Sequence, residues 1–200
     1  MGNAVVRQIV MLEDKGLEDL PREVYLQPAC HWALANNKLH SLDGDLRSQL
    51  ETLVSIDLHF NDFTQIPDGV FNLVFLKNLN FGTNSLQSVS PAIGQLIYLQ
   101  TLDLGFNSLK TLPESFSGLF FLGDLRLDHN LFETLPELPT LERLQTVNLS
   151  YNFLTELPRL SSTLTSLDLT RNVISRSFFL FSFSVHLLLF SSLTNCQSLS

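Results

Sequence analysis

The clearest pattern along the chain is a short stretch in which leucines alternate with polar residues and then meet an asparagine. In residues 99–113, LQTLDLGFNSLKTLP, Leu102 and Leu104 stand on either side of Asp103. Side chains two positions apart on a β-strand lie on one face of the sheet, so this spacing predicts a short strand with both leucines buried and Asp103 facing outward. Asn107 follows where the chain leaves the strand, and its amide is suited to bonding backbone groups exposed at the bend.

The same pattern recurs along most of the chain. Complete copies place their asparagine at 61, 84, 107, 130, 152 and 172, a weaker copy places it at 37, and a degenerate copy has Lys15 in that position. The steps between successive positions are 22, 24, 23, 23, 23, 22 and 20 residues. A period of this length predicts a solenoid in which each repeat adds one short strand to a parallel sheet.

The segments between the strands are short. An aliphatic residue followed by proline recurs at Ile66-Pro67, Leu112-Pro113, Leu135-Pro136 and Leu157-Pro158. Proline fixes φ and ends the extended path, and the Gly, Ser and Asn that follow predict irregular turns or single helical turns instead of long helices. Buried positions are expected at Leu73, Leu96, Leu119 and Leu141, with Phe71, Phe116 and Phe120 filling the space between turns.

The repeated motif, L-x-x-L-x-L-x-x-N-x-L, resembles that of the leucine-rich-repeat family, and the resemblance covers residues 7–174. It implies an α/β solenoid: a horseshoe of about eight repeats, with a parallel concave β-sheet and short irregular or 3-10 helical convex segments. The repeat length and the Leu-Pro pairs are most similar to intracellular repeats of Ras-pathway scaffolds and of related plant and protist proteins. We therefore interpret residues 1–174 as a leucine-rich-repeat domain.

Residues 175–200, SRSFFLFSFSVHLLLFSSLTNCQSLS, differ in composition from the repeats and contain no Asp, Glu or Lys. Three interpretations stay open for this apolar tail. It is a truncated or aberrantly spliced C-terminus, an apolar cap packed on the last repeat, or a membrane anchor. The apolar run 178–193 is shorter than the roughly 20 residues that a spanning helix needs.

The composition narrows the functional classes. The formal net charge of −8 lacks the basic footprint that nucleic-acid binding requires, and favours a protein partner with a basic surface. Phosphate-loop, nucleophile-elbow and HExxH motifs are absent from the sequence, and its histidines lack metal-ligand spacing. We therefore expect no catalytic residue, no cofactor and no metal site, and thus no enzyme. Two isolated cysteines favour a reducing, cytoplasmic location, with membrane contact only through residues 175–200 or acylation of Gly2.

The candidate binding site consists of positions that the core does not use. The residue between the strand leucines reads Asp57, Asn80, Asp103, Arg126, Asn148 and Asp168 along the repeats. The residue before each asparagine reads Phe60, Thr83, Phe106, His129, Tyr151 and Arg171. Aromatic side chains are typical anchors of protein interfaces. We predict that a partner docks on the concave face at Phe60, Phe106, His129 and Tyr151, framed by Asp57, Asp103, Arg126, Asp128 and Asp168.

Several alternatives remain at this level. Phe60 and Phe106 could instead fold over the turn and pack on their neighbours. The repeats are expected to form a non-enzymatic interaction module or scaffold in intracellular signalling, a description that the sequence does not separate from a cytoskeletal scaffold. The second possibility is the regulatory repeat region of a larger enzyme, of phosphatase, cyclase or kinase type, whose catalytic domain is absent from these residues.

Overall fold

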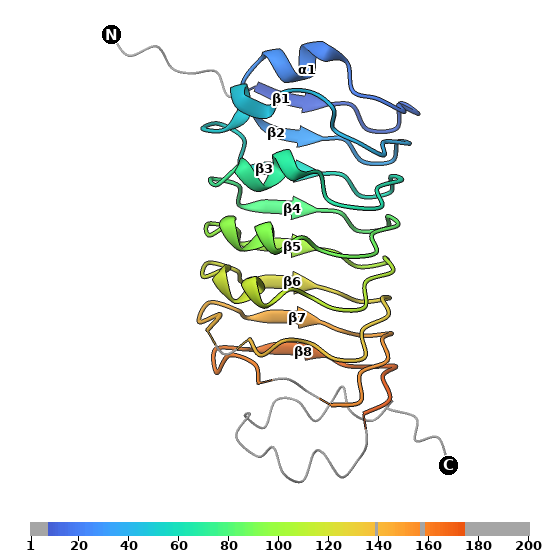
Figure 1. Ribbon diagram of the computed structural model, residues 1–200, viewed down its shortest axis with the longest axis vertical. Coiled ribbons are helices and arrows are strands. Elements are labelled where there is room, and N and C mark those ends of the chain that lie inside the picture. Colours follow the sequence, from blue (N-terminus) through green and yellow to red (C-terminus); the bar gives the residue numbers. More distant parts are fainter. Residues whose placement is uncertain (1–7, 139, 157–158, 175–200) are drawn as a thin grey trace.

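The computed structural model describes residues 8–138, 140–156 and 159–174, and these form one open, parallel sheet in which the strands follow the order of the sequence (Figure 1). Its strands are β1 (Gln8–Met11), β2 (Ala29–Ala33), β3 (Ser55–Asp57), β4 (Asn78–Asn80), β5 (Thr101–Asp103), β6 (Asp124–Arg126), β7 (Thr146–Asn148) and β8 (Ser166–Asp168). Because each strand pairs with its neighbours in the chain, every repeat adds one layer to a solenoid. The predicted fold class is confirmed.

The sheet register aligns equivalent positions of successive repeats. Pairing along the sheet joins one buried residue per strand, Ile56, Leu79, Leu102, Leu125, Val147 and Leu167. The residues on either side of this line are half-buried, such as Thr101 and Asp103 on β5, or exposed, such as Arg126 on β6, and they face away from the core. Side chains that are 20 to 24 residues apart in the sequence therefore become neighbours on the outer face of the sheet.

The convex side consists of short helices, as the sequence predicts. The one α-helix among the described residues is α1 (Arg22–Leu26), and the 3-10 helices are η1 (Leu46–Gln49), η2 (Asp68–Asn72), η3 (Pro91–Gln95) and η4 (Glu114–Gly118). Helices η2 and η4 begin directly after Pro67 and Pro113, whose fixed φ suits the residue before a helical turn. In Figure 1 the helices η2 to η4 lie toward the side where the strands begin, and α1 lies beyond β1 at the N-terminal end of the solenoid.

The core confirms most of the expected buried positions and contradicts one of them. The four anchors, Leu73, Leu96, Leu119 and Leu141, are fully buried, and so are Phe71 in η2 and Phe116 in η4. Phe120, in contrast, is 55% exposed. It lies in a tight turn closed by the Leu122 N–H, which donates to the Leu119 carbonyl at 3.0 Å. Because the leucines at the two ends of this turn point into the core, the residue between them points to solvent.

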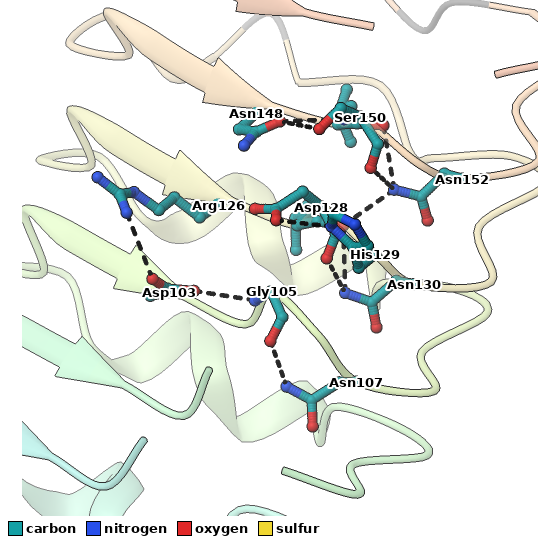
Figure 2. Close-up of polar contacts among 12 residues, drawn as sticks. Asp103, Gly105, Asn107, Arg126, Asp128, His129, Asn130, Asn148, Ser150 and Asn152 are labelled. Carbon is teal, nitrogen blue, oxygen red and sulfur yellow. Dashed lines mark hydrogen bonds and ion pairs between the residues drawn. The ribbon is translucent and has the colours of Figure 1, made fainter. Parts of the chain in front are cut away.

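The repeated asparagines bond the backbone where the chain leaves each strand. The Asn107 Nδ2 donates to the Leu104 carbonyl at 3.1 Å and to the Phe81 carbonyl of the preceding repeat at 2.9 Å. Its Oδ1 accepts from the Leu86 N–H at 2.8 Å. Asn107, Asn130 and Asn152 form a column along the solenoid in Figure 2. Each asparagine thus ties one repeat to the one before it and satisfies backbone groups that would otherwise be unpaired.

Some expectations fall on residues that the structure does not describe. These include the role of residues 175–200, the acylation of Gly2 and the pair Leu157-Pro158. Within the described ranges, none of the helices has the length and apolar character needed to cross a membrane.

Candidate partner-binding site

One backbone position has the same unusual conformation in every repeat. The residue preceding the asparagine position has φ between 51° and 59° at Asp14, Asn36, Phe60, Thr83, Phe106, His129, Tyr151 and Arg171. This left-handed region favours glycine and asparagine and is strained for bulky residues. The shared conformation directs these side chains in parallel, so that the rings of successive repeats can stack.

Phe106, His129 and Tyr151 form one continuous stack. The Phe106 and His129 ring centroids are 3.9 Å apart with planes inclined by 10°, and those of His129 and Tyr151 are 4.1 Å apart and inclined by 15°. Phe106 is 51% exposed and Tyr151 is 48% exposed. The three rings, which we call the ring stack, therefore form a flat and half-exposed surface across three repeats.

Phe60, the fourth predicted ring, lies apart from this stack. It makes an edge contact with His59, with centroids 5.4 Å apart, and Thr83 occupies the position between Phe60 and Phe106. The structure therefore divides the predicted set of four rings into two groups. Phe106 lies with its ring on that of His129 and still keeps about half of its surface in solvent.

Two carboxylates lie beside the ring stack. Asp103, the last residue of β5, accepts from the Gly105 N–H at 2.9 Å, and its Oδ2 is 3.9 Å from Nη1 of Arg126 (Figure 2). Asp128 Oδ2 is 3.1 Å from Nδ1 of His129. A Cβ at Gly105 would lie 3.0 Å from the Asp128 Oδ1 and 3.2 Å from the Asp103 Oδ1. Glycine at this position leaves room for both carboxylates to approach the same point.

The electrostatics of this point favour a cation. Burial raises the pKa of Asp103, and the neighbouring carboxylates Asp128 and Asp124 raise it further, against the opposing effects of the Gly105 N–H and Arg126. A positively charged group placed here would relieve the repulsion between the carboxylates. The ring stack and the carboxylates Asp103 and Asp128 together can therefore receive a side chain with an apolar stem and a cationic head.

The remaining predicted site residues extend along the sheet but do not join this centre. Asp57 on β3 contacts Nδ1 of His59 at 2.8 Å, and Asp168 on β8 accepts from the Thr170 N–H at 2.9 Å. The register places Asp57 and Asp168 in the same outward-facing column as Asp103. Asp57 lies two strands before β5, and Asp168 lies three strands after it. The site is thus a central cluster within a longer acidic column.

The sequence interpretation overlooked the N-terminal part of this edge. A hollow of about 400 Å³ is lined by Glu13, Asp14, Ala35, Asn36, His59 and Phe60. Asp14 and Asn36 occupy the same left-handed position as Phe60 in their own repeats, so the repeat alignment contained the signal. Among the residues that the structure describes, there is no group of three or more His, Cys, Asp or Glu side chains that could hold a metal ion.

Comparison with known proteins agrees with the fold. A family model described as Leucine Rich Repeat matches residues 98–119. Among solved structures, YopM from Yersinia enterocolitica WA-314 is similar with a TM-score of 0.70 and 30% identity, over 83% of this chain and 34% of YopM. No curated protein matches the chain. Together with the eight-stranded parallel sheet and the asparagine column, these findings show that the chain belongs to the leucine-rich-repeat family.

A second similar structure is the leucine-rich-repeat ectodomain of the plant membrane receptor kinase GASSHO1/SCHENGEN3 from Arabidopsis thaliana, solved in complex with CASPARIAN STRIP INTEGRITY FACTOR 2. The TM-score is 0.65 and the identity is 32%, over 78% of this chain and 20% of that ectodomain. The chain therefore spans about a third of the first structure and a fifth of the second. These neighbours indicate a repeat module for protein–protein interaction.

Proposed function

We propose that the chain is a non-catalytic, cytoplasmic interaction module that binds a protein partner at the ring stack and the adjoining concave sheet face. The ring stack carries this proposal. It leaves large aromatic surfaces half-exposed on a rigid scaffold, where they can be buried by a partner at little cost in side-chain entropy. More specifically, we propose that the module acts as a scaffold in intracellular signalling, as do the Ras-pathway repeats that the sequence resembles.

The partner surface proposed for this site is basic. Asp57, Asp103, Asp124 and Asp168 lie on the outward-facing columns of β3 to β8, where Arg126 is the cation among these strand residues. Asp128 adds a further carboxylate beside His129. A Lys or Arg side chain can place its methylene stem on the ring stack and its charge near Asp103 and Asp128, combining apolar burial with charge pairing.

The test compares proteins captured from a cell lysate by the wild-type chain and by the double variant Phe106→Ala and Tyr151→Ala. A partner of the ring stack should bind the double variant at least about tenfold more weakly, because removal of two interface anchors commonly costs more than about 2 kcal/mol. Isothermal titration with the captured protein measures the difference. The far-ultraviolet circular dichroism spectrum should stay the same, since both rings are exposed.

Phe153→Ala provides the matched control. Phe153 is 52% exposed and lies two residues after Tyr151, yet it is not part of the ring stack. Its removal should leave binding within about twofold of the wild type. Equal binding by the wild type and the double variant would overturn the proposal. A fluorescent fusion tests the cytoplasmic location, and enrichment in any other compartment contradicts that part of it.

A second candidate function is regulation of a larger enzyme. The similar plant structure is the repeat ectodomain of a receptor kinase, so repeats of this kind do occur attached to a catalytic domain. On this proposal the present repeats would recognise a ligand or restrain an enzyme domain encoded beyond Ile174. Sequencing the transcripts that contain these repeats discriminates between the two functions, because only the second requires an open reading frame with a catalytic motif after the last repeat.

A further inference from the structure

A second aromatic surface lies at the opposite edge of the sheet, where the strands begin. Before β4, β5 and β6, the chain makes three equivalent turns whose central residues are Val74 and Phe75, Ile97 and Tyr98, and Phe120 and Phe121. We call these six residues the turn ridge. Each turn is closed by a backbone bond of 2.9 or 3.0 Å from the leucine after it to the leucine before it, as from Leu76 to Leu73.

The geometry of these turns requires their central residues to face outward. The leucines that flank each turn are fully buried, whereas five of the six ridge residues are exposed, and Phe121 is half-buried. The rings contact one another from turn to turn: Phe75 and Tyr98 are stacked with centroids 6.0 Å apart, and those of Tyr98 and Phe121 are 5.4 Å apart. The core does not explain this apolar surface, because it is filled by the leucines that flank each turn together with other buried side chains such as Phe71 and Phe116.

The equivalent turns on either side of the ridge are polar. The sheet register places Glu51 and Glu142 at the same first turn position as Val74, Ile97 and Phe120. Both carboxylates are exposed, and neither forms an ion pair among the described residues. A line of three apolar side chains therefore carries one negative charge at each end.

Two cations lie near the ridge, and neither forms an ion pair with Glu51 or Glu142 among the described residues. The Arg143 guanidinium lies over the Phe121 ring, 4.2 Å from its centroid, and is held there by a cation–π contact. Lys77 is exposed in the Phe75 repeat, one strand from the Glu51 repeat, and it lies outside the two turn positions that form the ridge. Along the solenoid axis, the first turn position thus reads Glu51, three apolar side chains and Glu142, whereas the second turn position ends with Arg143.

We infer that the turn ridge binds an amphipathic α-helix of a partner protein, with apolar side chains over about three turns and a basic residue near each end. Neighbouring strands are about 4.8 Å apart, close to the 5.4 Å pitch of an α-helix, so successive helical turns can meet successive repeats. An extended peptide repeats its side chains at about 6.8 Å on one face and loses this match within two repeats.

The two glutamates also set the length of the helix. Four strand steps separate the Glu51 repeat from the Glu142 repeat, or about 19 Å, which corresponds to about 13 residues of helix. A second copy of the chain fits less well. A two-fold pairing centred on Ile97 and Tyr98 would bring the Glu51 end of one chain against the Glu142 end of the other, and like charges would oppose it.

The test selects displayed 16-residue peptides on the full-length chain. Enriched peptides should carry apolar residues at helical spacing over three turns, with Lys or Arg near both ends. The double variant Glu51→Lys and Glu142→Lys should bind such a peptide about tenfold more weakly in fluorescence anisotropy, since two attractive surface pairs become repulsive. A selection repeated on this variant should enrich peptides with acidic ends.

Two controls isolate the ridge from other surfaces. Glu133→Lys with Glu156→Lys makes the same charge change at exposed positions outside the ridge and should leave peptide affinity unchanged. Phe106→Ala with Tyr151→Ala should also retain binding, which separates this inference from the function proposed for the ring stack. The inference is wrong if enriched peptides lack basic ends, if the Glu51 and Glu142 variant binds equally well, or if sedimentation shows a dimer that Ile97→Ser dissociates.

Discussion

The two edges of the sheet present aromatic side chains in different ways. At the ends of the strands, the ring stack rests on a left-handed backbone and lies beside carboxylates, with the asparagine column bonding the turns below it. At the beginnings of the strands, the turn ridge is carried by ordinary turns between buried leucines. One repeated sequence thus produces a constrained, acidic edge and a simpler apolar edge, and each edge suits a different kind of partner surface.

The largest expected difference between the edges concerns stability. Asn107→Ala should lower the free energy of unfolding by about 2–4 kcal/mol, because the Phe81 and Leu104 carbonyls and the Leu86 N–H lose their partner. Phe120→Ala, at the turn ridge, should change it by less than about 0.5 kcal/mol, since its side chain is exposed. Urea denaturation followed by circular dichroism measures both values, and equal losses would contradict the contrast between the edges.

An intermediate effect is expected from the backbone strain at the ring-stack edge. Thr83 has a β-branched side chain at φ 53°, and asparagine accepts this conformation more readily. Thr83→Asn should therefore raise the free energy of unfolding by about 0.5–1 kcal/mol in the same denaturation experiment. Thr111→Asn, at an exposed residue outside the left-handed set, is the control and should have no stabilising effect. Destabilisation by Thr83→Asn would show that strain at this edge is unimportant.

The smallest expected effect is a pH dependence at Asp103. Burial raises the pKa of this carboxyl in the folded chain, so protonation favours folding. The protonated Asp103 carboxyl therefore contributes stability below its ordinary pKa of about 3.9. This contribution is lost as the pH rises through the raised pKa of the folded chain. Asp103→Asn should consequently become more stable relative to the wild type as the pH rises above about 3.9, as measured by urea denaturation at each pH.

Two other repeats of the chain already carry asparagine at the position of Asp103. Asn80 and Asn148 occupy the same column, and their Oδ1 atoms accept from the N–H groups of Gly82 and Ser150 at 2.9 and 3.0 Å. Asparagine can therefore replace Asp103 without losing the bond to Gly105. The reverse change, Asn80→Asp, should make the variant progressively less stable than the wild type as the pH rises. A stability difference that does not vary with pH would contradict the role assigned to burial.

The repeat period predicted much of the fold and part of the candidate site. It located the strands, the function of Asn107 and the outward-facing columns, because residues one period apart must meet in a solenoid. The period is a poor guide to Phe120: the sequence predicts burial for both Phe116 and Phe120, and only Phe116 is buried. Both are phenylalanines in the segment before a strand, and their environments differ because one lies in η4 and the other at the centre of the next turn.

The sequence by itself determined the architecture and the column in which each side chain lies. The spacing of residues along the chain is sufficient for this. The alternation of apolar and polar residues defines each strand, and the distance between successive copies of the motif defines how the repeats stack. The tertiary structure decided which members of a column touch: it joined Phe106, His129 and Tyr151, separated Phe60, and directed the turn ridge to solvent. These outcomes depend on the left-handed backbone and on the direction of each turn, which are established only when the repeats pack together.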